Sequence, residues 1–407
     1  MPNQLVEIGF EEVLPGGNWL TLDDPVKGKL DTALYPLAGF AYYDVTEYVT
    51  GIEVSRGKAD DIGTISAGEL VVTLNNRTRA FDPTYEAGPF YGNILPKRLV
   101  RYTANNVQQY QGVIDDWNLE YTPDGDAVAS FICSDGFVYL NNQTLGAGTA
   151  TAQLSGARIE AILDSEFVQW PATSRDIDAG TELLGANVVA DGQNVLEYLQ
   201  TVELSELGLF FISKEGNATF RDKNHVPITA DLVVLADDGT GVNYQNLLIG
   251  YGSEDLINEV VGTSVITTTQ TTVTDPDSQL EYGIFNATYD NLLLATDAQV
   301  ETFATTLLGK YAQPIYRFKE VQVRLNDLSL DDQNRVLGLE LGDFVQVIFT
   351  PSGIPPAITK YAEVIRANHE VDVTGEHIVT LGLNTLNSTF FVLDDLVFGR
   401  LDEGSLS

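Results

Sequence analysis

The sequence predicts a mainly β protein with an α+β insertion, in which two small antiparallel, barrel-like β domains flank a small α/β module. Three observations support this fold class. Short β-rich segments separated by turn residues fill residues 35–145, apolar residues take a helical spacing between 156 and 202, and short strands resume after one clear helix near residue 300. Closely spaced short strands joined by turns are typical of antiparallel barrels and sandwiches.

The N-terminal β domain is expected over residues 35–145, after an N-terminal arm of residues 1–34. Its predicted strands are 69–74, 98–103, 109–114, 117–121 and 127–133. Turn residues separate these strands, among them the pair Asn75-Asn76 and the triplet Pro123-Asp124-Gly125. The triplet is a strong hairpin signal, because each of its residues favours a turn.

The middle of the chain, residues 146–250, is predicted to form the α/β module. Ile159, Ile162 and Leu163 lie on one side of a helix over 156–163, and the apolar residues of 194–202 have the same spacing. A β-hairpin is expected at 208–221, with its turn at 214–217.

The clearest helix covers residues 297–311. Thr296 precedes it and Gln299 follows three residues later, which is the spacing of a capping box. Its apolar residues form one stripe, which we interpret as core, and Pro314 marks the exit. With strands predicted at 318–325, 343–349, 361–367 and 377–383, this helix belongs to a C-terminal β domain over 251–385.

Acidic residues outnumber basic ones by 58 to 22, which gives a formal charge of −36. This balance argues against a nucleic-acid binder, which neutralises phosphates with Lys and Arg, and against docking on anionic membranes. The charge is uneven, because no Lys or Arg occurs from Asn224 to Gly309. This stretch is either an ordinary solvated face or a surface that repels another polyanion.

Several classes of site are not supported. The single cysteine, Cys133, allows no intrachain disulfide, and it lies in a β pattern typical of a core residue. We see no secretory signal and no apolar run near the ~20 residues that span a bilayer, so we expect no stable membrane insertion.

Catalytic residues are not evident either. His369 and His377 lie on either side of a predicted turn, but no third metal ligand stands at a recognised spacing. Phosphate-binding loops and nucleophile elbows are absent from the sequence, and paired acids are expected by chance in so acidic a protein. We therefore expect no enzyme activity, no metal and no cofactor.

A ten-residue pattern occurs near both ends of the chain. It reads Leu-Asp-Asp-x-Val-x-Gly-basic-Leu-Asp at 22–31 and again at 393–402. Two interpretations of this repeat are about equally supported: an edge strand used twice, or two equivalent docking arms. The second makes candidate assembly contacts of Leu22, Asp23, Asp24, Gly28, Leu393, Asp394, Asp395 and Gly399, the last four within a C-terminal arm of residues 386–407.

One segment resembles a known family. It reads Val-Ser-Arg-Gly-Lys at 54–58, Leu-Asn-Asn-Arg-Thr-Arg-Ala-Phe-Asp-Pro at 74–83 and Gly-Pro-Phe-Tyr-Gly-Asn-Ile-Leu-Pro at 88–96. This is similar to the N-terminal region of minor tail proteins of long, non-contractile-tailed bacteriophages, where it belongs to the tail-tip (baseplate) hub. Compatible matches continue in the same order to about residue 402.

The resemblance implies a structural virion protein of the tail tip, assembled in the host cytoplasm. It implies a homotrimer whose six similar β domains match a sixfold tail tube, with tail-tube or distal tail proteins, the tape-measure protein and tip or fibre proteins as neighbours. Double-stranded DNA would pass through its channel during ejection and host cell entry without specific binding. The alternatives are a hydrolase of cell-envelope polysaccharide or peptidoglycan, or a carbohydrate-binding adhesin.

Basic residues concentrate within the same segment. Arg77, Arg79, Lys97, Arg98 and Arg101 stand within 25 residues of an otherwise acidic protein, and we expect them to contact acidic neighbours in the assembly. The alternative is that these side chains form local ion pairs within the protein.

Overall fold

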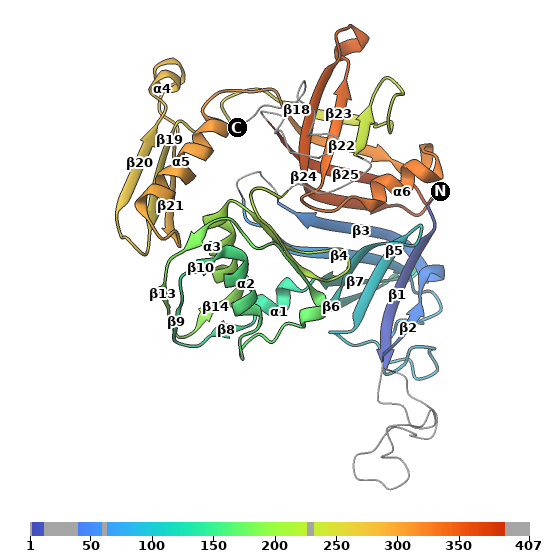
Figure 1. Ribbon diagram of the computed structural model, residues 1–407. Helices are drawn as coiled ribbons and strands as arrows, with labels where there is room; N and C mark the ends of the chain where they lie inside the picture. The colour runs from blue at the N-terminus through green and yellow to red at the C-terminus, as the bar shows by residue number, and fades with distance from the viewer. Residues whose placement is uncertain (1, 12–39, 59–62, 226–231, 387–407) are drawn as a thin grey trace. The chain divides into compact units, whose positions relative to one another are not determined.

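The computed structural model describes residues 2–11, 40–58, 63–225 and 232–386 (Figure 1). The chain divides into two units, which are described separately. The first comprises Met1–Val54, Glu69–Asp135 and Glu370–His377. The second comprises Ser55–Gly68, Gly136–His369 and Ile378–Ser407. Among the described residues, none of the helices combines the length and the apolar composition of a membrane-spanning helix.

The first unit is built on one sheet with the strand order β3-β4-β7-β6-β5-β1-β2. Its strands are β1 (Gln4–Glu11), β2 (Phe40–Asp44), β3 (Val49–Gly57), β4 (Ser66–Asn75), β5 (Leu99–Ala104), β6 (Val107–Tyr121) and β7 (Ala127–Ser134), with a short 3-10 helix at Thr46–Tyr48. Buried and less buried residues alternate along β5 and β7, so one face of the sheet forms the core.

Strand β6 corrects one prediction. The two strands expected at 109–114 and 117–121 are a single strand of 15 residues. Its pairing with β7 shifts between Ile114 and Asp116, which leaves Asp115 as the extra residue of a β-bulge. A bulge interrupts the alternation of buried residues, and this interruption looks like a strand end in the sequence.

The turn after β4 explains the Phe-Asp-Pro motif. Phe81 is fully buried, and its ring contacts those of Tyr48, Phe90 and Trp117 at centroid distances of 5.1, 5.2 and 5.9 Å. Asp82 caps the turn, because its carboxylate accepts hydrogen bonds from both the backbone and the hydroxyl of Thr84. The motif therefore anchors a long connection into the aromatic core.

The second unit begins with a small α/β part. Its helices are α1 (Phe137–Asn141), α2 (Ser155–Leu163) and α3 (Val195–Glu206), with a 3-10 turn at Ala172–Ser174. Its strands are β8 (Thr144–Leu145), β9 (Gly148–Ala150), β10 (Gln153–Leu154), β11 (Arg175–Ile177), β12 (Leu183–Leu184), β13 (Asn187–Val189), β14 (Gln193–Asn194), β15 (Leu209–Ile212) and β16 (Ala218–Arg221). The two predicted helices and the β15–β16 hairpin are confirmed, and the predicted apolar faces of α2 and α3 are buried.

A three-stranded sheet and a long helix follow. The sheet consists of β19 (Glu259–Ser264), β20 (Gln270–Thr274) and β21 (Asn286–Leu292), with α4 (Pro276–Tyr282) between the last two strands. Helix α5 (Asp297–Tyr311) packs against β19 and β20. Thr296 accepts the expected N-cap hydrogen bond from the Gln299 backbone, and the whole predicted stripe is buried.

The remaining strands form the C-terminal β region. They are β17 (Val233–Ala236), β18 (Asn246–Gly250), β22 (Arg317–Arg324), β23 (Phe344–Phe349), β24 (Ile358–Val371) and β25 (His377–Thr385). Strands β18, β22, β25 and β24 are neighbours in that order, β23 pairs with β24, and β17 pairs in parallel with β23. All four predicted strands are confirmed, whereas helix α6 (Leu330–Gly338) and the 3-10 helices Leu325–Asp327 and Pro351–Gly353 were not predicted.

Gly57 shows why the Arg-Gly-Lys motif needs its glycine. Gly57 has φ of +110°, and a Cβ placed there would lie 2.2 Å from the carbonyl oxygen of Ile365 in β24. The next residue, Lys58, donates its backbone N–H to the same oxygen at 2.8 Å. A side chain at position 57 would therefore collide with β24 as well as strain the backbone.

The predicted fold class is confirmed, since the described residues are mainly β with a small α/β part between two β regions. Within the described residues none of the sheets closes on itself. The strand orders of both β regions are therefore those of open sheets.

Candidate functional site

The three histidines have different surroundings. His225 pairs its Nδ1 with the Asp178 carboxylate at 2.8 Å, whereas His369 and His377 are buried in β24 and β25. Across the described ranges, no group of three or more His, Cys, Asp or Glu is arranged to hold a metal ion. Cys133 is buried in β7, and this burial raises the pKa of its thiol.

Three residues of the basic block are exposed and ion-paired. Arg77 pairs with Asp126 at 2.9 Å, Arg79 pairs with Asp82 at 2.7 Å, and Lys97 pairs with Asp115. Their side chains nevertheless remain 64%, 49% and 54% exposed. Hydrogen bonds from Thr84, and then from Arg79, hold the pKa of Asp82 well below its usual range. These three side chains therefore remain accessible to a partner, although each already has an acidic neighbour.

The other two basic residues are held more firmly. Arg101 forms an ion pair with Glu7 at 2.5 Å and places its guanidinium 4.0 Å from the centre of the Tyr42 ring. Arg98 is only 7% exposed. The eight candidate contacts of the terminal repeat, at 22–28 and 393–399, lie outside the described residues.

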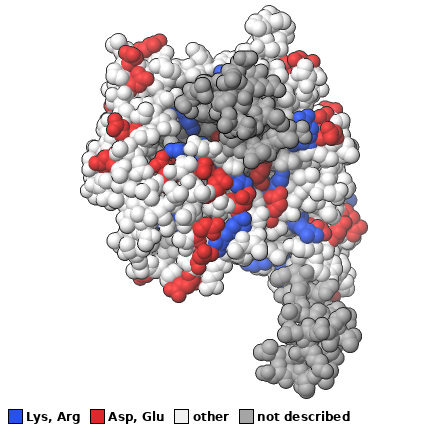
Figure 2. Space-filling view, in the orientation of Figure 1, with Lys and Arg blue, Asp and Glu red and all other residues white. Residues whose placement is uncertain are grey.

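Many acids of the stretch from Asn224 to Gly309 have local roles. Asp275 accepts the N-cap hydrogen bond of α4 from Ser278, and Glu254 and Asp255 form ion pairs with Lys319. On the face drawn in Figure 2, acidic side chains form several separate groups, with Lys and Arg beside some of them. The negative charge on this face is therefore distributed rather than gathered into one continuous area.

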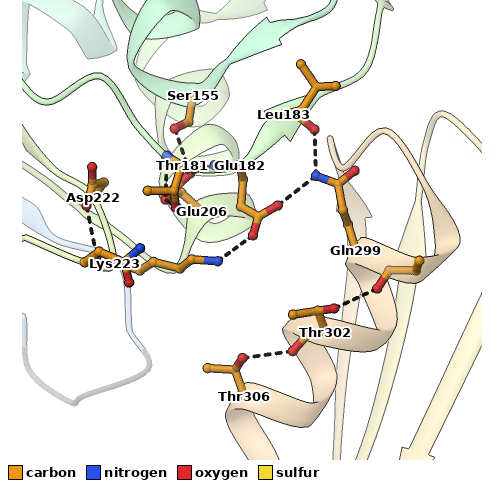
Figure 3. Close-up of polar contacts among 12 residues, drawn as sticks. Ser155, Thr181, Glu182, Leu183, Glu206, Asp222, Lys223, Gln299, Thr302 and Thr306 are labelled. Atoms are coloured by element: carbon orange, nitrogen blue, oxygen red, sulfur yellow. Dashed lines mark hydrogen bonds and ion pairs between the residues drawn. The ribbon is translucent and has the colours of Figure 1, made fainter. Parts of the chain in front are cut away.

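One polar site of the second unit surrounds a fully buried carboxylate (Figure 3). Glu206, at the end of α3, accepts hydrogen bonds from the Ser155 hydroxyl at 2.7 Å and the Thr181 hydroxyl at 2.6 Å. It also accepts from the backbone N–H groups of Thr181 and Glu182, at 3.2 and 2.8 Å. A buried carboxylate that is satisfied by four donor groups fixes the loop at 181–182 against α2 and α3.

Glu182 extends this network to α5. One carboxylate oxygen of Glu182 pairs with the Lys223 ammonium, and the other accepts from the Gln299 side-chain amide at 2.7 Å (Figure 3). The same amide group donates to the Leu183 carbonyl at 3.1 Å. Gln299 therefore serves both in the capping box of α5 and in a tertiary contact.

A second cluster surrounds Glu340, whose side chain is 18% exposed. Its carboxylate pairs with the Arg56 guanidinium at 2.8 Å and accepts the backbone N–H of Lys214 at 2.8 Å. Burial would raise the pKa of Glu340, but Arg56 and Lys214 together lower it. The Lys214 ammonium donates to the backbone carbonyls of residues 337–339, at the end of α6. These contacts make the Arg-Gly-Lys motif part of a structural cluster.

A cavity of about 590 Å³ lies within the second unit. Leucines of α3, β15 and α5 line it, together with Phe344 and Ile365. Several charged side chains also line it, and two of them form an ion pair with 3.4 Å between Lys58 Nζ and Glu203 Oε1. Burial raises the pKa of Glu203, and the charge of Lys58 opposes this increase. The volume is in the range of ligand pockets.

Sequence patterns did not identify Glu203 and Glu206 as buried, or Glu340 as the centre of a cluster. Glu203 and Glu206 lie in the last turn of α3 and continue the spacing of its buried apolar residues. An acid that takes an apolar position of the helical pattern is therefore the sequence signal that could have identified them as buried. The partners that satisfy them come from distant positions, which no local pattern contains.

Neither a family model nor a curated protein matches the sequence. Solved structures do match. A tail protein from Neisseria meningitidis MC58 is 11% identical, with a TM-score of 0.58 over 95% of this chain and 97% of that one. The 43 kDa tail protein of prophage MuSo2 from Shewanella oneidensis is 15% identical, with a TM-score of 0.55 over 84% of this chain and 95% of that one. The protein therefore has the fold of phage tail proteins, as the resemblance in its sequence predicted.

Proposed function

We propose that this protein is a structural component of a phage virion, the trimeric tail-tip hub that joins the tail tube to the distal tip. The observation that supports this role most strongly is the fold that it shares, over nearly the full length of both proteins, with the Neisseria tail protein. The proposal concerns function, because the sequence identity of 11% relates the two proteins only by fold.

The two β regions of each subunit give the hub its symmetry. Three subunits would present six similar β regions, and these would match the sixfold tail tube above. The neighbours are tail-tube or distal tail proteins, the tape-measure protein and tip or fibre proteins. The terminal repeat would supply six quasi-equivalent arms, two from each subunit.

The acidic composition suits a channel for DNA. With a formal charge of −36, the protein would give the channel an acidic wall that repels phosphates, so that DNA can pass without being held. The exposed members of the basic block have acidic partners within the protein, which reduces their attraction for DNA. Acids between Asn224 and Gly309 are our first candidates for the channel wall.

The decisive experiment is a cryo-EM map of the assembled tail tip. We expect three copies of this protein around the tail axis, continuous with the tube above. A particle with this protein elsewhere, or with another copy number, would contradict the proposal. In solution a trimer of about 133 kDa, three times 44.4 kDa, would support it. A stable monomer that hydrolyses cell-envelope glycans would favour the hydrolase instead.

Removal of the C-terminal arm tests the docking role of the repeat. A protein that lacks residues 386–407 should keep its fold but fail to attach neighbouring tail proteins. Normal tail assembly by this truncated protein would reject the arm as a docking element and leave the hub role standing.

A further inference from the structure

The cavity of the second unit contains an incompletely satisfied polar pair. The Glu203 side chain is only 4% exposed, and its carboxylate has only weak donors, the Phe210 backbone N–H and the Lys58 ammonium, with no hydrogen bond of normal geometry from the described residues. The nearest cation is Lys58 Nζ at 3.4 Å, on a side chain that is 11% exposed. Buried polar atoms in native proteins almost always have partners, so this carboxylate is an exception that calls for an explanation.

The pair offers both kinds of hydrogen bond. Glu203 has vacant acceptor positions, and the ammonium of Lys58 carries three donors, which cannot all point at one carboxylate. Because the two charges compensate each other, an added charge of either sign gains little. The group that complements such a pair is neutral, with an N–H donor beside a C=O acceptor. A peptide unit has this combination.

The apolar part of the lining favours an apolar occupant. Leu204 and Leu207 of the α3 end, Leu209 of β15 and Leu307 of α5 face the cavity. Five further basic residues line the cavity, and four of them have acidic partners: Arg221 pairs with Asp176, Lys223 with Glu182, His225 with Asp178 and Arg317 with Asp255. An anion would compete with these acids, whereas apolar side chains would bury surface against the leucines.

We propose that this cavity binds an apolar peptide segment of another protein, with a backbone amide of that segment donating to Glu203 and a backbone carbonyl accepting from Lys58. The segment places leucine-like side chains against the leucine wall. Recognition of the peptide backbone at a buried polar pair gives the site an orientation, and the leucines supply most of the contact area. The binding site does not depend on the hub role.

The test uses the full-length protein and two synthetic probes. The first is the blocked peptide acetyl-Leu-Ala-Leu-amide, and the second is the same peptide with every backbone nitrogen methylated. Titration calorimetry or ligand-observed NMR measures their affinities. We expect the first probe to bind at least about tenfold more tightly, because methylation removes the donor for Glu203. Equal affinities, or no binding of the first probe, would overturn the proposal.

Variants of Lys58 and Glu203 test whether the probe binds at this pair. The double variant Lys58→Met with Glu203→Leu keeps an apolar cavity of similar volume and removes the pair, so the preference for the unmethylated probe should disappear. Glu203→Gln is the milder variant if the first does not fold, and it should weaken the preference. The control is Glu363→Gln, a carboxylate of the same lining that already accepts from Asn384. A preference unchanged in both Glu203 variants would overturn the proposal.

A shortened protein that ends at Leu386 tests whether the bound peptide comes from another protein or from this protein's own residues. If the first probe binds this protein and the full-length protein alike, the occupant comes from another protein, as proposed. If the probe binds only the shortened protein, the protein's own residues compete for the cavity and the proposal is wrong. Neither result alters the copy number in the tail-tip map, so this test and that of the hub role fail independently.

Discussion

The side-chain amide of Gln4 in β1 lies 3.2 Å from Nδ1 of His377 at the start of β25, although 373 positions separate the two residues in the sequence. The same amide nitrogen reaches the Pro2 carbonyl, which can only accept, so the nitrogen end of the amide faces the ring. Nδ1 of His377 is therefore the acceptor, and the neutral ring carries its proton on Nε2. The Tyr102 hydroxyl donates to the amide oxygen at 2.6 Å and completes the orientation of Gln4.

This geometry predicts a loss of stability at mildly acidic pH. Burial lowers the pKa of His377 from 6.5 to about 4, because the charged ring is poorly solvated. A histidine with a lowered pKa in the folded state favours folding fully above pH 6.5, and this contribution declines as the pH falls towards 4. Below pH 4 the free energy of unfolding should be lower by on the order of 3 kcal/mol. Denaturant unfolding at several pH values measures it.

The matched variant for this experiment is His377→Gln, which keeps a hydrogen-bonding side chain that does not titrate. Carboxylates also titrate near pH 4, so the informative quantity is the difference between the two proteins. The unfolding free energy of the wild type should fall more steeply than that of the variant between pH 6.5 and 4. Parallel curves would show that His377 is not buried as a neutral ring.

Gly57→Ala should be severely destabilising. The substitution places a Cβ 2.2 Å from the Ile365 carbonyl oxygen at a positive φ, so it combines backbone strain with a collision. We expect a loss of about 2–4 kcal/mol in the free energy of unfolding. The control is Gly192→Ala, because Gly192 also has a positive φ, of +79°, but nothing lies within 4 Å of its added Cβ. Its cost should be only about 1 kcal/mol, the backbone part alone. Equal losses would show that the contact with β24 does not limit position 57.

The predicted elements that proved correct have local causes. Helix α5 is predicted by Thr296, Gln299 and one apolar stripe, and all these residues lie within 16 positions of the sequence. The β15–β16 hairpin is similarly local, with its turn at Gly216. Helix α6 was missed because its stretch Asp331-Asp332-Gln333-Asn334-Arg335 is polar and because the whole helix buries only three residues. An apolar period cannot be recognised in so short a pattern.

The candidate site was mostly beyond prediction because its parts meet only in the folded protein. Lys58, Glu203 and Ile365 line one cavity but are separated by more than a hundred positions at each step. The basic block was visible as a cluster in sequence, but the sequence does not show that Arg98 is buried while Arg77 is exposed. Alternation of apolar residues predicts which face of a strand is buried. It gives no information on Arg77 and Lys97, because the connection that contains them lies outside the strands.

Glu206→Gln tests whether the network of Figure 3 stabilises the second unit. The amide would turn an N–H₂ group towards the N–H and O–H donors of Ser155, Thr181 and Glu182, and one acceptor would be lost in a fully buried place. We expect the free energy of unfolding to fall by about 2–4 kcal/mol. The control is Glu197→Gln on the exposed side of the same helix, which should change little. A small effect at position 206 would mean that the loop is held by its backbone contacts alone.

Removal of two exposed charges tests the basic block as an assembly surface. In the double variant Arg77→Gln with Lys97→Gln the melting temperature should stay near that of the wild type, because the pairs with Asp126 and Asp115 are exposed and contribute little to folding. If these side chains meet acidic neighbours in the tail, the yield of complete tails should fall, and it should fall further at higher salt because screening weakens the remaining attraction. The control is Lys360→Gln, which also removes a positive charge but lies in β24, outside the block. A normal yield in the double variant would leave Arg77 and Lys97 with local ion pairs as their whole role.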